Sequence, residues 1–192
     1  MNTPSHAILN LVIFNQQLRD QASPAILIGA VLPDIPIFVF YLLMKFVYRL
    51  PEKQIWSEVY YQPFWQGIVS TFHSVPLAVL GLLIAHFWNW QLIEIALISM
   101  VLHSLLDFPV HNNDAHRHFF PLSNYRFISP VSYWDRNHYG AIAALVEFLL
   151  VIGATIVLFS STLTHWGKVI LIAVNVFYLV GYYRFYLKSS SD

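Results

Sequence analysis

The chain has 192 residues, of which 57% are apolar and 10% are charged, with ten basic and ten acidic side chains and no cysteine. Soluble domains average roughly 25% charged residues, so this chain has too few charges to cover a surface that faces water. The composition excludes a disordered chain, a disulfide scaffold and a basic nucleic-acid-binding protein, so no nucleic acid is expected as a partner, and it favours a membrane protein.

The first expected element is a helix over Ser5–Leu18, with Thr3 or Ser5 as its N-cap. Its apolar stretch, Ala7–Phe14, is too short to cross a bilayer. We expect this helix to lie at the membrane interface or to pack into a bundle. No Lys or Arg precedes the stretch and no convincing cleavage site follows it, so it is not interpreted as a signal peptide.

Five longer stretches are apolar enough to span a bilayer, which requires a helix of roughly 20 residues. Tryptophan and tyrosine gather at their ends, as in the aromatic belts of membrane proteins. We therefore predict an all-α integral membrane helical bundle of about five transmembrane helices plus the short N-terminal helix, in a single domain over residues 1–192. The length of the stretches disfavours a soluble bundle of buried helices. The predicted spans are Pro24–Tyr48, Phe64–Trp88, Trp90–Phe108, Tyr139–Ser160 and Trp166–Leu187.

Basic residues are distributed unevenly between the loops. With five alternating spans, eight of the ten fall on one side of the membrane and only Arg19 and Lys168 on the other. Because cytoplasmic loops are enriched in Lys and Arg, this predicts a multi-pass protein of the cell inner (plasma) membrane, with its N-terminus outside and its C-terminus cytoplasmic. The lipid bilayer is thus an expected partner.

Ionisable side chains inside spans are costly and therefore mark functional sites. His103 and Asp107 are four residues apart, so a helix places both on one face. Such a pair can either coordinate a cation or form a hydrogen bond between two buried polar groups. Asp34 lies between Pro33 and Pro36, and these two prolines break the helix. Asp34 then either caps the helix that restarts at Pro36 or faces a polar cavity.

His73 lies within the second span, and His6 opens the first helix. Each of these two alone is more typical of a hydrogen-bonded histidine than of a ligand. Together with Asp34, His103 and Asp107 they come from four separate segments, and each would cost several kcal/mol in lipid-like surroundings unless paired. Convergence on one polyvalent cation removes that cost for all of them, so we expect a metal site.

This order of motifs resembles the bacterial YdjM-type membrane-bound metal-dependent hydrolase family, which is similar in motif order to zinc-dependent phospholipase C and P1-type nucleases. The matching residues are His6, Gly29 with Pro33-Asp34, His73-Ser74, and His103 with Asp107. The resemblance implies an all-helical fold, bound Zn²⁺ and phosphoester hydrolysis. Two departures from phospholipase C, Met1-Asn2 in place of an N-terminal Trp and the lack of a later H-x-x-x-E pair, favour one or two ions over three.

The sizeable polar region Pro109–His138 is expected to be an ordered loop, because it is rich in aromatic residues and proline. Any of its histidines could complete a metal site, since imidazole is the commonest metal ligand. His116 and His118 could also flank a bound phosphate together with Arg117. The alternative is a polar connector at the level of the lipid headgroups. The predicted substrate-binding residues are His111, His116, Arg117 and His118.

We therefore expect a membrane-bound metal-dependent hydrolase that acts on a phosphoester such as a phospholipid headgroup. Its Zn²⁺, or another divalent ion, would be held by Asp34, His73, His103 and Asp107, with His6 as a further ligand. The ion would lower the pKa of a bound water, and Asp34 or Asp107 would act as the catalytic residue that takes its proton. The competing expectations are a small membrane transporter or proton/metal conduit, and a haem protein with histidine axial ligands.

Overall fold

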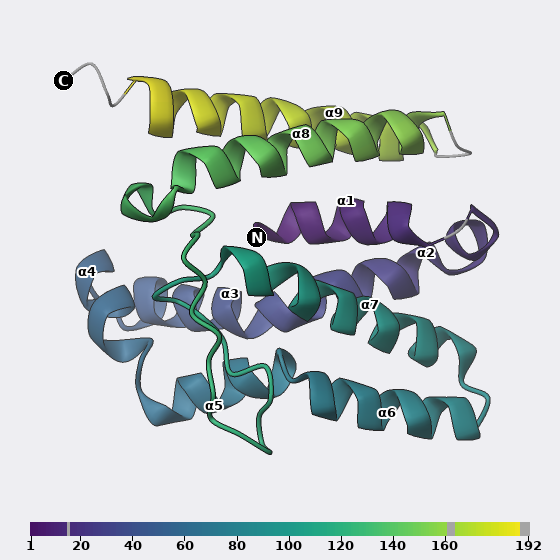
Figure 1. Ribbon diagram of the computed structural model, residues 1–192, viewed down its shortest axis with the longest axis horizontal. Coiled ribbons are helices and arrows are strands. Elements are labelled where there is room, and N and C mark those ends of the chain that lie inside the picture. Colours follow the sequence, from purple (N-terminus) through teal and green to yellow (C-terminus); the bar gives the residue numbers. More distant parts are fainter. Residues whose placement is uncertain (15, 161–163, 189–192) are drawn as a thin grey trace.

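The computed structural model describes residues 1–14, 16–160 and 164–188, and all regular structure in those ranges is helical. The helices lie roughly side by side (Figure 1), with α1 between α8 on one side and α2 and α7 on the other. The predicted all-α helical bundle is therefore confirmed. The α-helices are α1 (Thr3–Ile13), α2 (Gln16–Val31), α3 (Ile35–Leu42), α4 (Glu52–Gln54), α5 (Pro63–Phe72), α6 (Val75–Phe87), α7 (Gln91–Asp107), α8 (Gly140–Phe159) and α9 (His165–Tyr182).

Short turns of other helix types extend or connect these helices. Turns with 3₁₀ geometry are η1 (Leu32–Asp34), η4 (Phe108–Val110) and η5 (Arg136–His138). Single π-helical turns are η2 (Leu43–Val47), η3 (Ile55–Val59) and η6 (Tyr183–Leu187). Such turns inside or beside a long helix often accompany functional sites, because they change the direction in which the backbone aims its side chains.

Four helical segments are long and apolar enough to cross a bilayer, and the bent pair α5 and α6 forms a fifth if it counts as one span. Many of their apolar side chains are exposed on the isolated chain, as is expected of surfaces that contact lipid. The predicted spans agree closely with these segments, although the first begins earlier than predicted. The four are Arg19–Val47, Gln91–Val110, Gly140–Phe159 and His165–Leu187.

The N-terminal helix α1 begins earlier and ends earlier than predicted. Its N-cap residue is Asn2, so the prediction that Thr3 or Ser5 caps it is wrong. The physical reason is Pro4, which lacks a backbone N–H and fits best in a first turn, where N–H groups have no helical partner. A start at Thr3 puts Pro4 in that turn and leaves the hydroxyls of Thr3 and Ser5 free to bind other helices.

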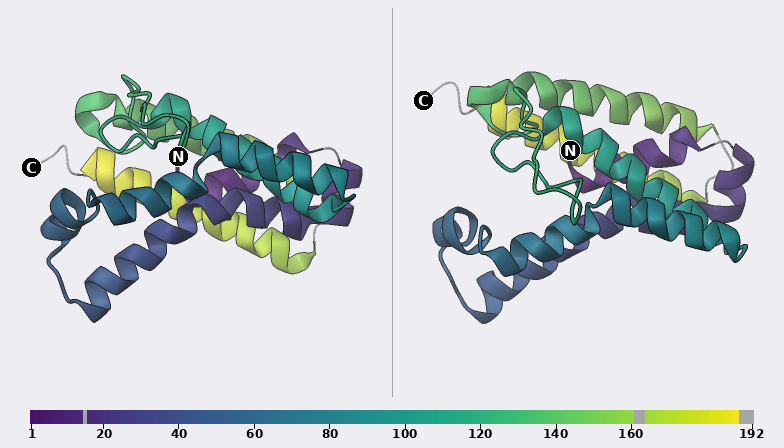
Figure 2. Two further views of the ribbon diagram at one scale, coloured as in Figure 1. Left: turned by 90° about the horizontal axis from the view of Figure 1, so that it is seen from below. Right: turned by 60° about the horizontal axis from the view of Figure 1, so that its bottom comes forward.

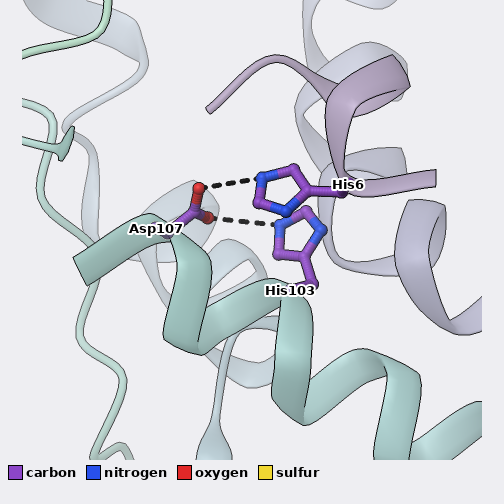
Figure 3. A group of neighbouring side chains, drawn as sticks. All are labelled: His6, His103 and Asp107. Carbon is purple, nitrogen blue, oxygen red and sulfur yellow. Dashed lines mark hydrogen bonds and ion pairs between the residues drawn. The ribbon is translucent and has the colours of Figure 1, made fainter. Parts of the chain in front are cut away.

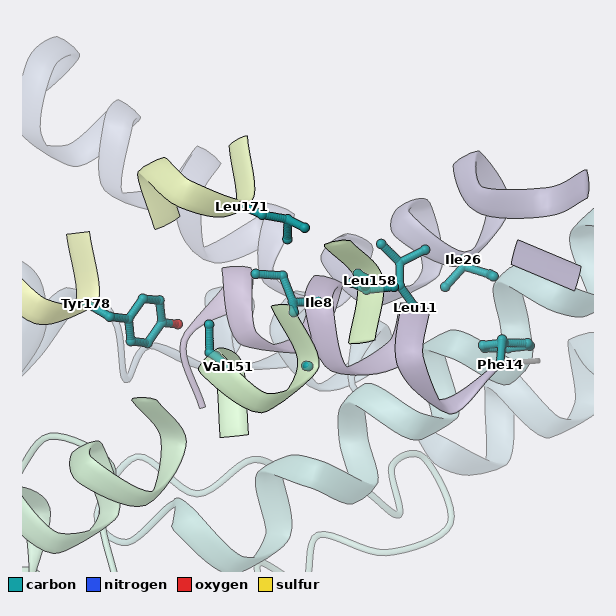
Figure 4. Close-up of a cluster of buried hydrophobic side chains, with 9 residues drawn as sticks. Ile8, Leu11, Phe14, Ile26, Val151, Leu158, Leu171 and Tyr178 are labelled. Carbon is teal, nitrogen blue, oxygen red and sulfur yellow. The ribbon is translucent and has the colours of Figure 1, made fainter. Parts of the chain in front are cut away.

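Of the two placements expected for this helix, packing into the bundle is the one observed. Side chains of α1 meet α2, α8 and α9 in the largest apolar cluster (Figure 4). Lipid tails are as apolar as these side chains, so close van der Waals packing is what holds such a cluster together inside a bilayer. The buried members are Ile8, Leu11, Phe14, Ile26, Val151, Ala154, Leu158, Leu171 and Tyr178.

Two of the spans are interrupted at residues that were predicted to bind metal, Asp34 and His73. The turn η1 separates α2 from α3 and ends at Asp34, and α5 meets α6 at a 43° bend whose connecting residues are His73 and Ser74. Ser74 begins α6 as its N-cap, and α7 ends at Asp107. Irregular backbone at membrane depth is tolerated only where it is buried in protein or lines a cavity. The breaks therefore mark a polar site inside the bundle.

The polar segment between α7 and α8 crosses beside α5 before it returns to the start of α8 (Figure 2). Backbone hydrogen bonds tie it to the helices: the N–H of Val75 donates to the carbonyl of His118 at 2.9 Å, and the N–H of Tyr133 donates to that of Val110 at 2.9 Å. The hydroxyl of Ser74 donates to the carbonyl of Phe120. These contacts hold the histidines of the segment against the bend between α5 and α6.

Glu147 of α8 anchors the beginning of α1. It is buried, and its Oε1 accepts hydrogen bonds from the backbone N–H of Asn2 at 2.9 Å, the hydroxyl of Ser5 at 2.6 Å and the hydroxyl of Tyr178 at 3.2 Å. One carboxylate oxygen thus connects three helices. It also sets the position of His6, the residue that follows Ser5.

Replacing Glu147 by Ala should lower the free energy of unfolding by about 2–3 kcal/mol, because buried donors left without an acceptor cost roughly 1–3 kcal/mol each. Tyr178→Phe removes only one donor from the network and should cost about 1 kcal/mol. Equilibrium unfolding of the detergent-solubilised protein measures both. Equal stabilities of Glu147→Ala and the unchanged chain would contradict the anchoring role.

Candidate metal centre

The five residues predicted as metal ligands lie together in the interior. His6 comes from α1, Asp34 from η1, His73 from the bend between α5 and α6, and His103 and Asp107 from the last turns of α7. The three histidines are 0% exposed and Asp107 is 1% exposed. Segments far apart along the chain therefore place imidazoles and carboxylates at one point where water is largely excluded.

The two oxygens of Asp107 face different partners. Oδ1 is 3.0 Å from Nε2 of His6 and 3.1 Å from Nε2 of His111. Oδ2 is 3.2 Å from Nε2 of His103 and 3.9 Å from Nε2 of His73. Figure 3 shows His6 and His103 approaching the two oxygens separately. The carboxylate thus lies between two pairs of imidazoles. Its Oδ1 is also 2.7 Å from the amine of Met1.

Asp34, at the end of the turn η1, lies close to two of these histidines, His73 and His103. Its Oδ1 is 3.5 Å from Nε2 of His73 and 3.6 Å from Nε2 of His103. Its Oδ2 accepts a hydrogen bond of 2.5 Å from the hydroxyl of Thr3. Although Asp34 immediately precedes α3, its side chain makes no capping hydrogen bond to that helix. Asp34 was expected either to cap α3 or to face a polar cavity. The structure shows its carboxylate turned toward the polar interior.

Backbone carbonyls orient two of the histidines. Nδ1 of His73 lies 2.9 Å from the carbonyl oxygen of Val69, and Nδ1 of His103 lies 2.7 Å from that of Ala30. A carbonyl only accepts, so each Nδ1–H donates, and in the neutral ring Nε2 carries a lone pair. Both Nε2 atoms are buried, and neither makes a hydrogen bond within the part of the chain that the structure describes. A lone pair that faces a carboxylate oxygen requires a proton or a cation between the two atoms. A hydrogen bond from Nδ1–H to a backbone carbonyl is typical of histidines that bind metal through Nε2.

The spacing of the donor atoms fits a small divalent ion. Four ligands at roughly 2.0–2.1 Å from a tetrahedral ion lie about 3.3 Å from one another. The N–O separations that link His73 and His103 to the two aspartates are 3.2–3.9 Å. The buried His/Asp groups could therefore hold a metal ion. Three overlapping sets have donor atoms within 4.8 Å of one another: His6, His103 and Asp107; Asp34, His73 and His103; and His73, Asp107 and His116.

Two residues that the sequence predicted as substrate-binding lie among these donors. The ring of His116 stacks on that of His73 with centroids 4.0 Å apart. His111 contacts Asp107 through Nε2, and its Nδ1 is 3.1 Å from Oδ2 of Asp114. A signal for His111 was present in the sequence, because His103, Asp107 and His111 repeat at four-residue intervals. For His116, which no helix carries, no such spacing exists.

Of the other two predicted substrate-binding residues, His118 lies at the edge of the cluster and Arg117 is turned to α5. His118 is buried and stacks on Phe108 with centroids 4.3 Å apart, and neither of its ring nitrogens has a hydrogen-bond partner among the described residues. Burial lowers the pKa of His118 to about 3, and burial also lowers the pKa of His6 to about 4. Both rings are therefore neutral at pH 7, the form that binds metals. Nε of Arg117 donates to the hydroxyl of Ser70 at 2.8 Å.

A cavity of about 540 Å³ connects this cluster with the surface. Asp34, His111 and His116 line its inner part, and Trp56, Tyr60 and Tyr133 are among the aromatic residues that form its walls. Small-molecule sites have volumes of roughly 300–1,000 Å³ and combine apolar walls with a few polar groups. The cavity is therefore large enough to bring a substrate group to the buried donors.

Comparisons with known proteins add no family to this description. No protein-family model, no curated protein and no solved structure matches the chain. The functional argument therefore depends on the geometry of the metal centre and its cavity.

Proposed function

We propose that this protein is a membrane-bound hydrolase that uses two divalent metal ions to cleave a phosphoester. The observation that carries the proposal is the position of Asp107, whose two oxygens face separate sets of histidines. Zinc suits the donor set best, because imidazole nitrogen and carboxylate oxygen are its common ligands whereas magnesium and calcium prefer oxygen alone.

We divide the residues into two ligand groups that share Asp107, according to the oxygen of Asp107 that each histidine faces. His73, His103 and Asp34 would hold one ion together with Oδ2 of Asp107. His6 and His111 would hold the other together with Oδ1. Such ions supply Lewis-acid chemistry, polarising a phosphoryl oxygen and lowering the pKa of water. The resemblance to metal-dependent hydrolases, which comes from the sequence, is in keeping with this reaction.

Both aspartates are proposed ligands, and Asp34 has a second role in the proposal. Asp107 is almost fully buried between four histidines, and its role is to hold the ions together. Asp34 lines the cavity, so its carboxylate can accept the proton of the attacking water. The hydroxyl of Thr3 fixes the orientation of that carboxylate through Oδ2. His118 lies beside His73 and is the residue proposed to steady the phosphate group, whereas the guanidinium of Arg117 donates to Ser70 and Asn124.

A phospholipid is the proposed substrate. The cavity is walled by tryptophan and tyrosine, which gather at the level of lipid headgroups. The loop before α5 and the end of α9 lie at one end of the bundle, and the polar segment before α8 lies in the same half (Figure 1). Eight of the ten lysines and arginines belong to these three regions of the chain. We place that end at the cytoplasmic face of the inner (plasma) membrane, because cytoplasmic loops are enriched in Lys and Arg.

Metal analysis of the purified protein tests the proposal. The unchanged chain should carry about two equivalents of a zinc-like ion and release them to a chelator with loss of stability, because metal binding stabilises the folded state. His103→Ala should lose hydrolysis and about one of the two ions, since His103 belongs to one ligand group. The matched control is His86→Ala, since His86 is an exposed histidine that pairs with Glu94 at 3.2 Å.

Three outcomes would overturn the hydrolase. They are a purified chain without a bound divalent ion, His103→Ala protein with its full metal content, and metal or proton flux through the protein in vesicles without stoichiometric retention, which indicates a conduit.

A further inference from the structure

A second cavity, of about 550 Å³, lies where the end of α7 approaches the beginning of α8. Figure 1 shows that α1 begins between these two helix ends. The lining is apolar apart from Glu147, whose Oε1 is turned to the hydrogen-bond donors of Asn2 and Ser5. We call this cavity the α7/α8 groove. The residues that shape it include Leu106, Val110, Val131, Ile142, Val146 and Leu150.

The groove is open toward the surface that the spans present to lipid. Ile142, Val146 and Leu150 are 62%, 50% and 50% exposed, and they are spaced by four residues along α8. On a helix this spacing forms one stripe about 12 Å long, since each residue rises 1.5 Å. The stripe starts next to Tyr139, at the junction with the polar segment, and continues into the span. The groove therefore runs from the membrane surface into the hydrocarbon region.

The side of the groove that faces the protein interior lies next to the metal centre. Met1 lines both this groove and the cavity that holds Asp34 and His116. The amine of Met1 is 2.7 Å from Oδ1 of Asp107, while Leu106, next to Asp107 in the chain, lines the groove. One amphiphile could therefore lie with its polar group at the carboxylates and its apolar part along α8.

We propose that the α7/α8 groove holds one acyl chain of the lipid whose phosphoester reaches the metal centre. The identity of the lipid's polar group rests on the proposed function, whereas the binding of its acyl chain in the groove does not. An acyl chain is solvated equally well by the bilayer and by the groove, so the hydrophobic effect does not favour the groove. The groove contributes a complementary shape and a fixed direction for the acyl chain. A chain held along α8 places its phosphoester beside Asp107 and lowers the entropic cost of reaching the reactive position. The substrate is accordingly a long-chain phospholipid taken directly from the membrane.

Photolabelling tests the binding of the chain without any reaction. The full-length protein is reconstituted in nanodiscs with a phospholipid that carries a photoactivatable group on its acyl chain. This lipid should label α8 between Ile142 and Leu150. Val146→Trp fills the groove and should reduce this labelling about tenfold, a loss of the size that a filled hydrophobic pocket produces. Val157→Trp is the matched control, since Val157 is exposed on the same helix and lies outside the groove. Ile142→Trp is a second blocking variant if Val146→Trp does not fold.

Hydrolysis assays then separate the two proposals. Val146→Trp should slow cleavage of a long-chain phospholipid about tenfold while leaving cleavage of a water-soluble phosphodiester unchanged. If the unchanged chain cleaves neither substrate but shows the groove-specific labelling, the hydrolase is wrong and the groove is supported. Equal labelling of the Val146→Trp and Val157→Trp proteins overturns the groove.

Discussion

Asp107→Asn is expected to remove both metal ions and to lower hydrolysis by about 10³-fold, since a bound ion supplies several kcal/mol of charge stabilisation in the transition state. An asparagine has one carbonyl oxygen and an NH₂ group in place of two acceptor oxygens. It cannot face the pair His6 and His111 and the pair His73 and His103 with an acceptor on each side. Elemental analysis and a phosphodiester assay on the purified variant measure the two effects.

Single-ligand variants sharpen this prediction. His6→Ala removes a ligand from one group only and should reduce the metal content by about one ion, as should His73→Ala for the other group, because the two groups share Asp107 alone. Glu94→Gln is the control for a carboxylate exchange on α7. Its side chain pairs with the exposed His86 and lies outside the cluster, so metal content and activity should be unchanged. An Asp107→Asn protein with two ions would rule out the shared carboxylate.

Gly29→Ala is expected to destabilise the protein by about 3 kcal/mol or more, at the upper end of the cost of overpacking a core. A Cβ at position 29 would lie 1.9 Å from the backbone oxygen of Ala96 and 2.8 Å from Cβ of Ser99. Because the nearest atom belongs to the backbone of α7, no side chain can move aside, and α2 must separate from α7. Small residues at helix contacts permit this close approach in membrane proteins.

The same substitution should weaken metal binding, although Gly29 is not a ligand. The next residue, Ala30, supplies the carbonyl oxygen that orients His103, and η1 with Asp34 follows directly on α2. Thermal unfolding in detergent and metal analysis measure the two consequences. Gly153→Ala in α8 is the control, because no atom of another described segment lies within 4 Å of its Cβ position. It should be neutral, or stabilise by up to about 1 kcal/mol through helix propensity. Unchanged stability and metal content in Gly29→Ala would contradict the tight contact.

Local rules were sufficient for the helices and for part of the site. Continuous apolar stretches of about 20 residues predicted the spans, because the thickness of the bilayer sets that length. A spacing of four placed His103 and Asp107 on one helix face, and the prolines around Asp34 predicted the interruption that appears as η1. The N-cap of α1 was misjudged because Thr3, Ser5 and Pro4 offer competing signals within one turn.

Other parts of the site depend on contacts between segments. His116 lies in a segment without periodicity, and only the hydrogen bonds of that segment to the bend near His73 bring it to the cluster. Glu147 could be recognised as a costly group in a span, but its partners are more than 30 residues away along the chain. Local sequence patterns carry no record of such pairings.

The sequence by itself determined that the chain is helical, that its helices suit a bilayer, and which side chains are too polar to face lipid, because each of these follows from the chemistry and spacing of neighbouring residues. Only the tertiary structure decided that these side chains meet, which oxygen of Asp107 each histidine faces, and that a groove leads from the lipid to the same point. These features depend on how far one helix is shifted and rotated against another. Contacts such as that of Gly29 with Ala96 set those shifts, and they arise only when the helices pack.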